Sequence, residues 1–486
     1  MNNTVHNSNG IISNVLWKFA ERIAAQLVSL IVSIILARLL FPEDYGIIGM
    51  VTVFITIANA FVTSGFPNAL IQKKDADSLD FSSVFHFNIV FSIIIYLVLF
   101  FSAPYIAYFY SMEDLTSVIR IMGLRLIIAG VNSVQHAYVS RHMMFRKYFW
   151  STLFGTLLSG VIGVLLAFRG YGVWALVAQY MINTTVDTIV LFITVDWRPK
   201  LYFSFGRLQP LLKFGWKIFV EGVSTTIFGQ LRSLIIGRVY TSSDLGYYSK
   251  AQQYPQLIVT NISSAVSSVL FPAMSNEQEN NKRVISMLRK SIRITSYVVL
   301  PILTGLAAVA PTFVSVLLTD KWLACIPYLY VFCFTNVLTV AMIPRHQALN
   351  AIGRSDVFMR EHVIGRVINI ILLFLLYKIS IFALVASGVI ASIVQLLIIA
   401  YTSWRYNGYR IIDQIIDVLP TLLGCAIMFG PVYLMNYISI NKCILLAGQI
   451  ATGCGVFVLY SFVTKSNELF MLIRYVKTVF RGGREK

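Results

Sequence analysis

The sequence contains few charged residues. Asp, Glu, Lys and Arg together account for 12% of its 486 residues, whereas 57% of the residues are hydrophobic and the mean hydropathy is +0.74. A water-soluble domain could carry so many apolar side chains only if most of its surface were apolar as well. The composition therefore argues against a soluble enzyme and predicts a membrane protein.

Motifs of nucleotide, metal and redox sites are absent as well. No G-x-x-x-x-G-K-[ST] segment occurs, so the sequence has no nucleotide-driven motor. Its five cysteines form no C-x-x-C pair and have no histidine at ligand spacing, and we interpret them as small side chains buried in the membrane. No nucleophile with a nearby base stands out, and no connection is long enough to house a catalytic domain. We therefore expect no metal, no cofactor and no enzymatic activity.

The net charge of +18 does not indicate a nucleic-acid-binding protein. Such a protein needs its basic residues on one solvated face, whereas here they fall in short clusters between long apolar runs. The first apolar run also carries Glu21 and Arg22 and continues to Leu40. It therefore reads as an uncleaved membrane helix and not as a signal peptide.

Fourteen apolar runs reach the roughly 20 residues that a helix needs to cross the hydrocarbon core. They cover residues 15–40, 45–70, 81–109, 115–138, 149–168, 172–195, 211–236, 245–271, 290–317, 323–344, 358–378, 381–403, 417–436 and 442–463. The termini and the loops on their side carry 23 Lys and Arg, and the opposite loops and helix ends carry seven. This asymmetry places both termini in the cytoplasm.

One short segment occurs twice. ILARLLFPEDYG (35–46) is answered by IIGRVYTSSDLG (235–246), with Arg, Asp and Gly repeated at an offset of 200. Six helices per repeat leave both copies in the same orientation, as in transporters built from parallel repeats. Locally, Asp44 and Asp244 can cap the following helix, and Gly46 and Gly246 can permit a tight turn.

The predicted fold is an all-α integral membrane protein of about 14 helices. The repeat divides it into an N-terminal six-helix lobe, a C-terminal six-helix lobe, two additional transmembrane helices and a cytoplasmic amphipathic tail. Their boundaries are 1–200, 201–410, 411–465 and 466–486. In the tail, apolar residues such as Leu469 and Ile473 recur at helical spacing with basic residues off that face, which predicts an interfacial helix.

Several segments resemble the polysaccharide transporter family of the multidrug/oligosaccharidyl-lipid/polysaccharide exporter superfamily. The first span, SNVLWKFAERIAAQLVSLIVSIILARLLFPEDYGIIGM, is similar to the start of that family. The similarity continues through SRHMMFRKYFW (140–150), FRGYGVWALVAQ (168–179), FGRLQPLLKFGWKIFVEG (205–222), SSDLGYYSKAQQYPQLI (242–258) and ALNAIGRSDVF (348–358). It is closest to the Gram-negative branch that exports colanic-acid-like or lipopolysaccharide repeat units.

The resemblance implies a flippase in the bacterial inner membrane. Such a protein moves undecaprenyl-diphosphate-linked oligosaccharide from the cytoplasmic to the periplasmic leaflet during surface polysaccharide biosynthesis. The implied partners are this lipid-linked oligosaccharide, membrane lipids, and a polysaccharide polymerase with its chain-length machinery. The resemblance does not identify the sugar.

Charges inside the predicted spans are mostly positive. The cations are Lys18, Arg22, Arg120, Arg125, Lys213, Lys217, Arg232, Arg293 and Arg366, and the acids are Glu21, Asp187, Glu221 and Glu361. An intramembrane charge costs at least about 2.5–3.5 kcal/mol on insertion scales, so it should face the bundle interior or a cavity. Even with every acid paired, five cations are left over, and such a surplus suits an anion. A diphosphate matches the fork of an arginine.

Polar residues recur on one face of several spans. Arg125, Asn132 and His136 share a stripe, and so do Gln179, Asn183 and Asp187; Lys213, Lys217, Glu221 and Thr225 form another, as do His362, Arg366 and Asn369. We expect Asp187 to neutralise Lys217 or Lys213. The residues nearer the span ends, Lys18, Lys213 and Arg293, are expected to extend to the headgroups.

The deeper residues Arg22, Arg125 and Arg366 could serve a cavity or a buried pair, and both interpretations stay open. The predicted substrate-binding set is Arg22, Arg125, Lys217 and Arg366. Glu21, Asp187 and Glu221 are the candidates for charge balance or for coupling to H⁺ or Na⁺. Two other functions remain as alternatives: a cation-coupled multidrug antiporter of the same superfamily, whose cavity should be acidic, and a membrane-embedded polysaccharide-assembly enzyme.

Overall fold

The structure is a computed structural model that describes residues 8–471, 473 and 474. Side chains are described from Ala24 onward, except Asn68. The described residues form helices and connecting turns, without a β-strand. The contacts divide the chain into two compact units, Met1–Gly246 (unit 1) and Tyr247–Lys486 (unit 2).

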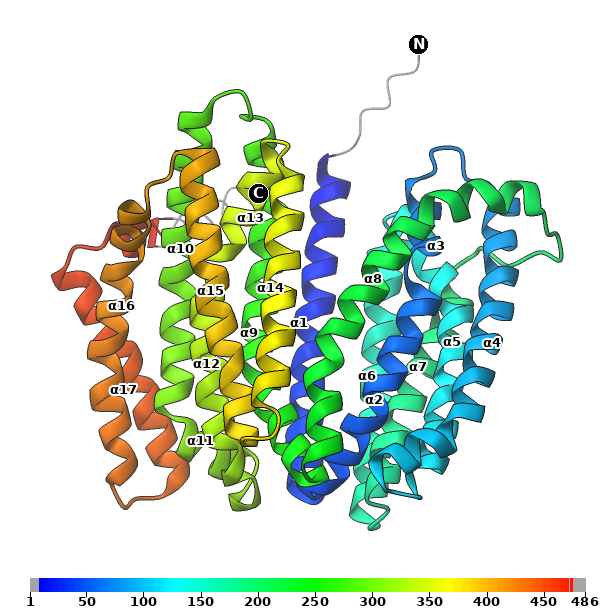
Figure 1. Cartoon of the computed structure of the whole chain (residues 1–486), viewed down its shortest axis with the longest axis horizontal. Coiled ribbons are helices and arrows are strands. Elements are labelled where there is room, and N and C mark those ends of the chain that lie inside the picture. The colour runs from blue at the N-terminus through cyan, green and yellow to red at the C-terminus, as the bar shows by residue number, and fades with distance from the viewer. Residues whose placement is uncertain (1–7, 472, 475–486) are drawn as a thin grey trace. The chain divides into compact units, whose positions relative to one another are not determined.

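Unit 1 contains eight helices (Figure 1). They are α1 (Ser8–Leu39), α2 (Pro42–Thr63), α3 (Phe66–Gln72), α4 (Ser78–Tyr110), α5 (Leu115–Arg141), α6 (Phe145–Phe168), α7 (Val173–Thr194) and α8 (Phe205–Val239). α4 packs on α5, α6 packs on both α1 and α7, and α8 packs on α2, α3 and α4. The helix that was predicted to open the second lobe therefore makes its contacts within unit 1. The lobe boundaries inferred from the repeat stay a prediction.

Unit 2 begins within α9 and runs to the C-terminus. Its elements are α9 (Ser242–Ser275), α10 (Asn281–Ala308), α11 (Ala310–Leu317), the 3-10 helix η1 (Asp320–Cys325), α12 (Ile326–Val340), α13 (Met342–Ala351), α14 (Ser355–Leu376), α15 (Ile381–Asn407), α16 (Ile411–Leu434), the 3-10 helix η2 (Met435–Tyr437) and α17 (Lys442–Val463). α10 packs against both α12 and α16, and α16 packs against α17 (orange to red in Figure 1).

Each of the fourteen predicted spans falls on a helix or on a helix broken by a short turn. Within the described residues, eleven helical segments are long and apolar enough to cross a membrane, and the chain is a multi-pass membrane protein. α1, α8 and α14 are not among the eleven. The part of α1 whose side chains are described, Ala24–Leu39, is apolar but shorter than a membrane span. α8 and α14 contain the charged residues predicted above to lie on one helix face. Membrane crossing by these three helices stays a prediction.

Small residues allow the helices of unit 1 to approach closely. Gly130 on α5 faces Ser92 on α4, and a Cβ atom on that glycine would lie 2.5 Å from the serine Oγ. Nearby, Asn88 Nδ2 donates a hydrogen bond to Ser133 Oγ at 2.9 Å. Small side chains and interhelical hydrogen bonds are what stabilise helix pairs in a membrane, where lipid offers apolar surface of its own.

The repeated segment caps two helices as expected. The Asp44 carboxylate accepts from the Phe41 N–H at 2.9 Å at the start of α2, and the Asp244 carboxylate accepts from the Thr241 N–H at 3.2 Å at the start of α9. These hydrogen bonds satisfy backbone donors that a helix start leaves without partners. The capping prediction is confirmed.

The expected role of the repeated glycines is wrong. Gly46 and Gly246 lie inside helices and have no positive φ. A Cβ atom on Gly46 would lie 1.7 Å from the Ser242 carbonyl oxygen, and one on Gly246 would lie 2.0 Å from the Pro42 carbonyl oxygen. Each glycine therefore makes room for the backbone of the other copy. The two copies of the segment therefore pack against each other.

The predicted interfacial tail is described only in part. Residues 467–471, 473 and 474 are helical, and Leu469 packs against a core cluster of unit 2 that includes Tyr297 and Phe457. The remainder of the tail, from residue 475 on, lies outside the described residues. The interfacial position stays a prediction.

Candidate functional site

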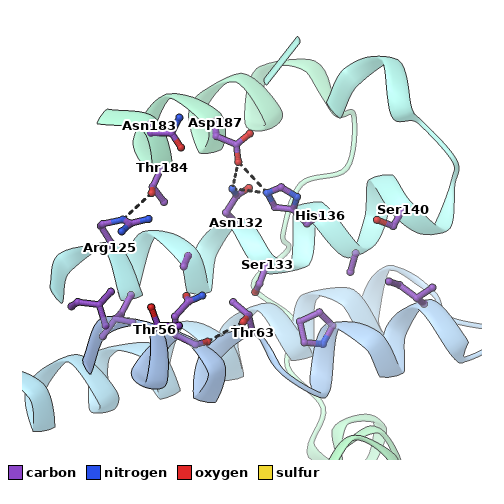
Figure 2. Close-up of a pocket in the computed structure, with 17 residues that line it drawn as sticks. Thr56, Thr63, Arg125, Asn132, Ser133, His136, Ser140, Asn183, Thr184 and Asp187 are labelled. Atoms are coloured by element: carbon purple, nitrogen blue, oxygen red, sulfur yellow. Dashed lines mark hydrogen bonds and ion pairs between the residues drawn. The ribbon is translucent and has the colours of Figure 1, made fainter. Parts of the chain in front are cut away.

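A polar cavity of about 470 Å³ lies within unit 1, between α2, α3, α5 and α7 (Figure 2). Eleven of its 17 lining residues are polar or charged. They are Thr56, Asn59, Thr63, Arg125, Asn132, Ser133, His136, Ser140, Asn183, Thr184 and Asp187. The volume lies in the range of about 300–1,000 Å³ that is usual for ligand pockets.

Two of the stripes predicted from helical spacing face each other across this cavity. Arg125, Asn132 and His136 come from α5, and Asn183 and Asp187 come from α7. Residues three, four or seven apart share a face of a helix, which is why each set points the same way. Charged and amide side chains on membrane helices should face a cavity or a partner, and these do both.

Asp187 is held by hydrogen bonds from α5. Its Oδ2 atom accepts from Asn132 Nδ2 at 2.7 Å and lies 3.0 Å from His136 Nε2 (Figure 2). The other ring nitrogen of His136 contacts the Tyr148 hydroxyl on α6. Asn132 is 5% exposed, and the side chains of His136 and Asp187 are 28% and 17% exposed. The network is therefore partly open to the cavity.

The prediction that Asp187 neutralises Lys217 or Lys213 is wrong. Its partner is His136, and both lysines have exposed side chains on α8. Lysine side chains are long enough to leave the helix packing and reach polar surroundings, whereas a short aspartate must be satisfied by its nearest neighbours. Helical spacing gave the face of Asp187 correctly and its partner incorrectly.

Of the predicted cations whose side chains the structure describes, Arg125 lines this cavity. Its Nε atom donates to Thr184 Oγ1 at 3.1 Å, and its guanidinium carbon lies 5.1 Å from the centre of the Tyr180 ring. Among the described residues no acidic side chain forms an ion pair with it. A half-buried guanidinium without an acid is an anion-binding group with unused donors.

Three other predicted residues, Lys217, Glu221 and Arg366, do not line this cavity. Lys217 and Glu221 are exposed on α8, where Glu221 accepts a hydrogen bond from the Thr225 hydroxyl at 2.8 Å. Arg366 is half-buried on α14 in unit 2. The side chains of Glu21 and Arg22 lie outside the described residues. A common cavity formed by Arg22, Arg125, Lys217 and Arg366 stays a prediction.

Unit 2 contains an ion-pair cluster that the sequence did not indicate. Arg289 and Arg293 on α10 both bind Asp417 on α16: Arg289 Nε lies 2.8 Å from Asp417 Oδ2, and Arg293 Nε lies 2.8 Å from Oδ1. The Tyr409 hydroxyl donates to Asp417 at 2.7 Å. Arg293 therefore has an acidic partner on the neighbouring helix α16, and its extension to the headgroups stays a prediction.

A second buried cluster in unit 2 surrounds Glu361. This residue is 1% exposed on α14, accepts a hydrogen bond from the Thr402 hydroxyl and lies 3.7 Å from His346 Nε2. Arg345, 3% exposed, belongs to α13 beside it. Glu361 was recognised as an intramembrane acid, but its partners come from other helices and no spacing in the sequence joins them.

The polar cavity residues that the sequence did not single out carry hydroxyl and amide side chains. Thr56, Asn59 and Thr63 on α2 follow one another at intervals of three and four, which places them on one face. That spacing was readable from the sequence. The spacing carries little weight alone, since a threonine hydroxyl in a helix can donate to the carbonyl four residues earlier, as Thr63 does to the Asn59 carbonyl at 2.9 Å.

The chain has relatives in polysaccharide biosynthesis. It is 27% identical over 316 residues to "Succinoglycan biosynthesis transport protein ExoT" of Rhizobium meliloti (strain 1021), covering 65% of this chain and 64% of that protein. It is 25% identical to "Teichuronic acid biosynthesis protein TuaB" of Bacillus subtilis (strain 168), covering 78% and 77%. It is 22% identical to "Lipopolysaccharide biosynthesis protein WzxC" of Escherichia coli (strain K12), covering 72% of each.

Two solved structures share the fold of this chain. The chain superposes on the lipid II flippase MurJ in an inward closed conformation with a TM-score of 0.72 at 17% identity, covering 93% of this chain and 98% of that one. An inward-facing multidrug resistance MATE family transporter of the MOP superfamily gives a TM-score of 0.60 at 14% identity, covering 82% and 98%. These similarities confirm the predicted all-α transporter fold.

The family model for polysaccharide biosynthesis proteins matches residues 35–327, which is more than half of the chain. The match spans the repeated segment, all of the cavity in unit 1 and the first helices of unit 2. It confirms the resemblance drawn from the sequence. The chain belongs to the polysaccharide biosynthesis protein family.

Proposed function

We propose that this protein is a flippase for undecaprenyl-diphosphate-linked oligosaccharide repeat units. It moves them from the cytoplasmic to the periplasmic leaflet of the bacterial inner membrane, by alternating access, for the synthesis of a surface polysaccharide. The observation that carries the proposal is the family membership of a chain with a transporter fold and a polar cavity in unit 1. A relative named as a succinoglycan transport protein supports it.

The chemistry of the cavity suits a sugar attached to a phosphate. Its hydroxyl and amide side chains, such as Asn59, Ser133 and Asn183, can both donate and accept hydrogen bonds, as sugar hydroxyls require. Arg125 supplies a cation without an acidic partner, which suits a diphosphate. In this proposal Arg22, Lys217 and Arg366 add to that positive charge at other stages of transport.

The membrane potential favours export of such a substrate. Moving a headgroup of net charge about −2 from a negative interior to a positive exterior gains roughly 4–5 kcal/mol at 100 mV. Both chain termini lie in the cytoplasm in this proposal, as the distribution of Lys and Arg predicts. Glu21, Asp187 and Glu221 are the residues we propose to test for coupling to H⁺ or Na⁺. A polymerase and its chain-length machinery would receive the exported units.

The alternative is a cation-coupled multidrug antiporter, because the fold is shared with a MATE family transporter. A cationic drug needs an acid in the cavity, and Asp187 is there. That carboxylate is engaged by Asn132 and His136, whereas Arg125 offers unused donors. The cavity therefore favours an anionic substrate over a cationic one.

Deletion of the gene tests the proposal. A strain that lacks the protein, and has no redundant flippase, should lose its surface polymer and accumulate lipid-linked repeat units on the cytoplasmic face of the inner membrane. Extraction of the accumulated lipid would identify the sugar. Normal polymer with increased sensitivity to cationic drugs would instead support the antiporter.

A further inference from the structure

A second cavity, of about 660 Å³, lies in unit 2 between the first turns of α10 and the helical residues that follow α17. Its charged lining consists of Lys282, Arg289, Lys290, Arg293, Arg474 and Glu468. The lining of this cavity therefore contains five basic residues and one acidic residue. This cavity belongs to unit 2 alone and shares no residue with the polar cavity of unit 1.

The amphipathic start of α10 directs these cations into the cavity. Val284, Leu288 and Ile292 recur at intervals of four and are fully buried in a core cluster of unit 2. Residues between them, including Lys290, lie on the opposite face of the helix and point away from the core, because residues four apart share one helix face. The positive face of α10 is thus a consequence of its buried apolar face.

Two of the five cations are fixed in place. Arg289 and Arg293 share Asp417, whose side chain is fully enclosed, and Arg289 also lies 3.7 Å from Asp413. Their side chains are 34% and 38% exposed, and both arginines line the cavity. Rigid guanidinium groups lose little conformational freedom when they bind an anion.

The two lysines keep their charge available. Lys282 and Lys290 have exposed side chains, and neither forms an ion pair with an acid in the part of the chain that the structure describes. Among the described side chains, the five cations of the lining outnumber Asp413, Asp417 and Glu468 by two. An anion would remove this repulsion between like charges.

The position of the cavity indicates where the anion comes from. The predicted spans begin at residues 290 and 417 and end at 463, and these predictions place the cavity at the level of the lipid headgroups on the side rich in Lys and Arg. Ile294 and Phe470 line it as well and offer apolar contacts beside the charges. A phosphate with attached acyl chains fits both features, whereas a free anion uses only the first.

We propose that this cavity binds the phosphate group of an anionic phospholipid from the surrounding leaflet. Arg289 and Arg293 hold the phosphate oxygens, Lys282 and Lys290 contribute the remaining positive charge, and the acyl chains stay in the bilayer. The bound lipid joins α10 to the residues after α17. The site is independent of the transported substrate, and transport activity is not needed to detect it.

Lipid binding by the purified full-length chain tests the site. The probe is dioleoylphosphatidylglycerol, compared with dioleoylphosphatidylcholine, and bound lipid is counted by native mass spectrometry. Replacing both exposed lysines (K282Q and K290Q together) should weaken binding of the anionic lipid by about tenfold or more, since each such charge is worth about a factor of five near a membrane surface. The E468Q variant should bind the same lipid more tightly, because it removes the acid of the lining.

A matched pair of variants provides the control. Arg360 and Arg405 are exposed on α14 and α15, lie outside the cavity lining, form no ion pair in the described part of the chain, and carry the same total charge as the two lysines. Their replacement (R360Q and R405Q together) should leave binding of the anionic lipid unchanged. If both double variants lost the same amount of anionic-lipid binding, the proposed site would be contradicted, and a general positive surface potential would explain the binding. Full displacement of the lipid by millimolar inorganic phosphate would overturn the lipid assignment in favour of a free anion.

Discussion

Asp187 in unit 1 and Asp417 in unit 2 both lie on membrane helices, but their surroundings differ. Asp417 is fully enclosed by Arg289, Arg293 and the Tyr409 hydroxyl. Asp187 is 17% exposed, receives hydrogen bonds from Asn132 and His136, and faces a cavity. The carboxylate of Asp417 is fully surrounded by its partners, whereas the carboxylate of Asp187 is accessible to a ligand in the cavity.

The difference separates structural charges from candidate functional ones. A carboxylate surrounded by charged donors has no capacity left for a substrate, and its removal leaves two guanidinium groups without their acid. A carboxylate at a cavity can change partner during a transport cycle because only part of its surroundings is fixed. The number and charge of the donors around each carboxylate distinguish the two cases.

The Asp417→Asn substitution should have the largest effect on stability. It removes the negative charge shared by two arginines, and breaking a buried ion pair costs about 3 kcal/mol or more. Because both arginines can still reach water, we expect the lower end of that range. A fall in Tm of the detergent-purified protein would measure it, with Tyr409→Phe as a milder control that removes one hydrogen bond and about 1 kcal/mol.

The same substitution in unit 1, Asp187→Asn, should cost less stability and more function. Asparagine can still accept the hydrogen bond from Asn132, so we expect a loss of about 1–2 kcal/mol. Polymer export in a complementation assay should nevertheless fall, because the side chains of Asn132 and His136 lose the charge that orients them in the cavity. A Tm loss equal to that of Asp417→Asn, with export unchanged, would erase the distinction between the two acids.

An exposed acid completes the series. Asp77 precedes α4, and its carboxylate accepts from the backbone N–H groups of Asp80 at 2.9 Å and Leu79 at 3.1 Å. The Asp77→Ala substitution should cost about 1 kcal/mol, the usual value of a helix cap. We expect no change in export beyond this, because Asp77 does not line the cavity.

The contribution of Asp77 should depend on pH. The hydrogen bond from the Asp80 N–H is the main cause that holds the pKa of Asp77 below its usual range, with help from Arg207. A pKa that is lower in the folded than in the unfolded state stabilises the fold above the unfolded value, and that stability is lost as the pH falls through the lowered pKa. The Tm difference between Asp77→Ala and the unchanged protein should therefore shrink in acid and persist at neutral pH.

The sequence predicted the membrane helices because apolar runs and their length are local properties. It also predicted which residues share a face, as the stripes of Asn132 with His136 and of Asn183 with Asp187 demonstrate. It could not predict that these two faces meet, nor that Arg293 finds Asp417 124 residues further along the chain. Such pairings depend on which helices pack together, and no spacing within one helix contains that information.

The repeated glycines illustrate the same limit. The sequence indicated that Gly46 and Gly246 matter, and the most local explanation, a tight turn, was the wrong one. Their reason is the approach of two backbones separated by 200 residues in sequence. The sequence does not distinguish a glycine that is needed for close packing with a distant segment from one that is needed for a positive φ angle.

The most direct test of the proposed function measures flipping by the purified protein and its Arg125 variants. Proteoliposomes would contain an undecaprenyl-diphosphate-linked oligosaccharide, and a membrane-impermeant reagent would report its exposure on the outer leaflet. We predict that Arg125→Ala slows flipping about tenfold or more, since a hydrogen bond to a charged group is lost, and that Arg125→Lys retains part of the rate. Arg120→Ala, on the same helix but stacked on the Phe100 ring outside the cavity, should flip normally. Unchanged flipping by a well-folded Arg125→Ala protein would contradict the assignment of this cavity to the substrate.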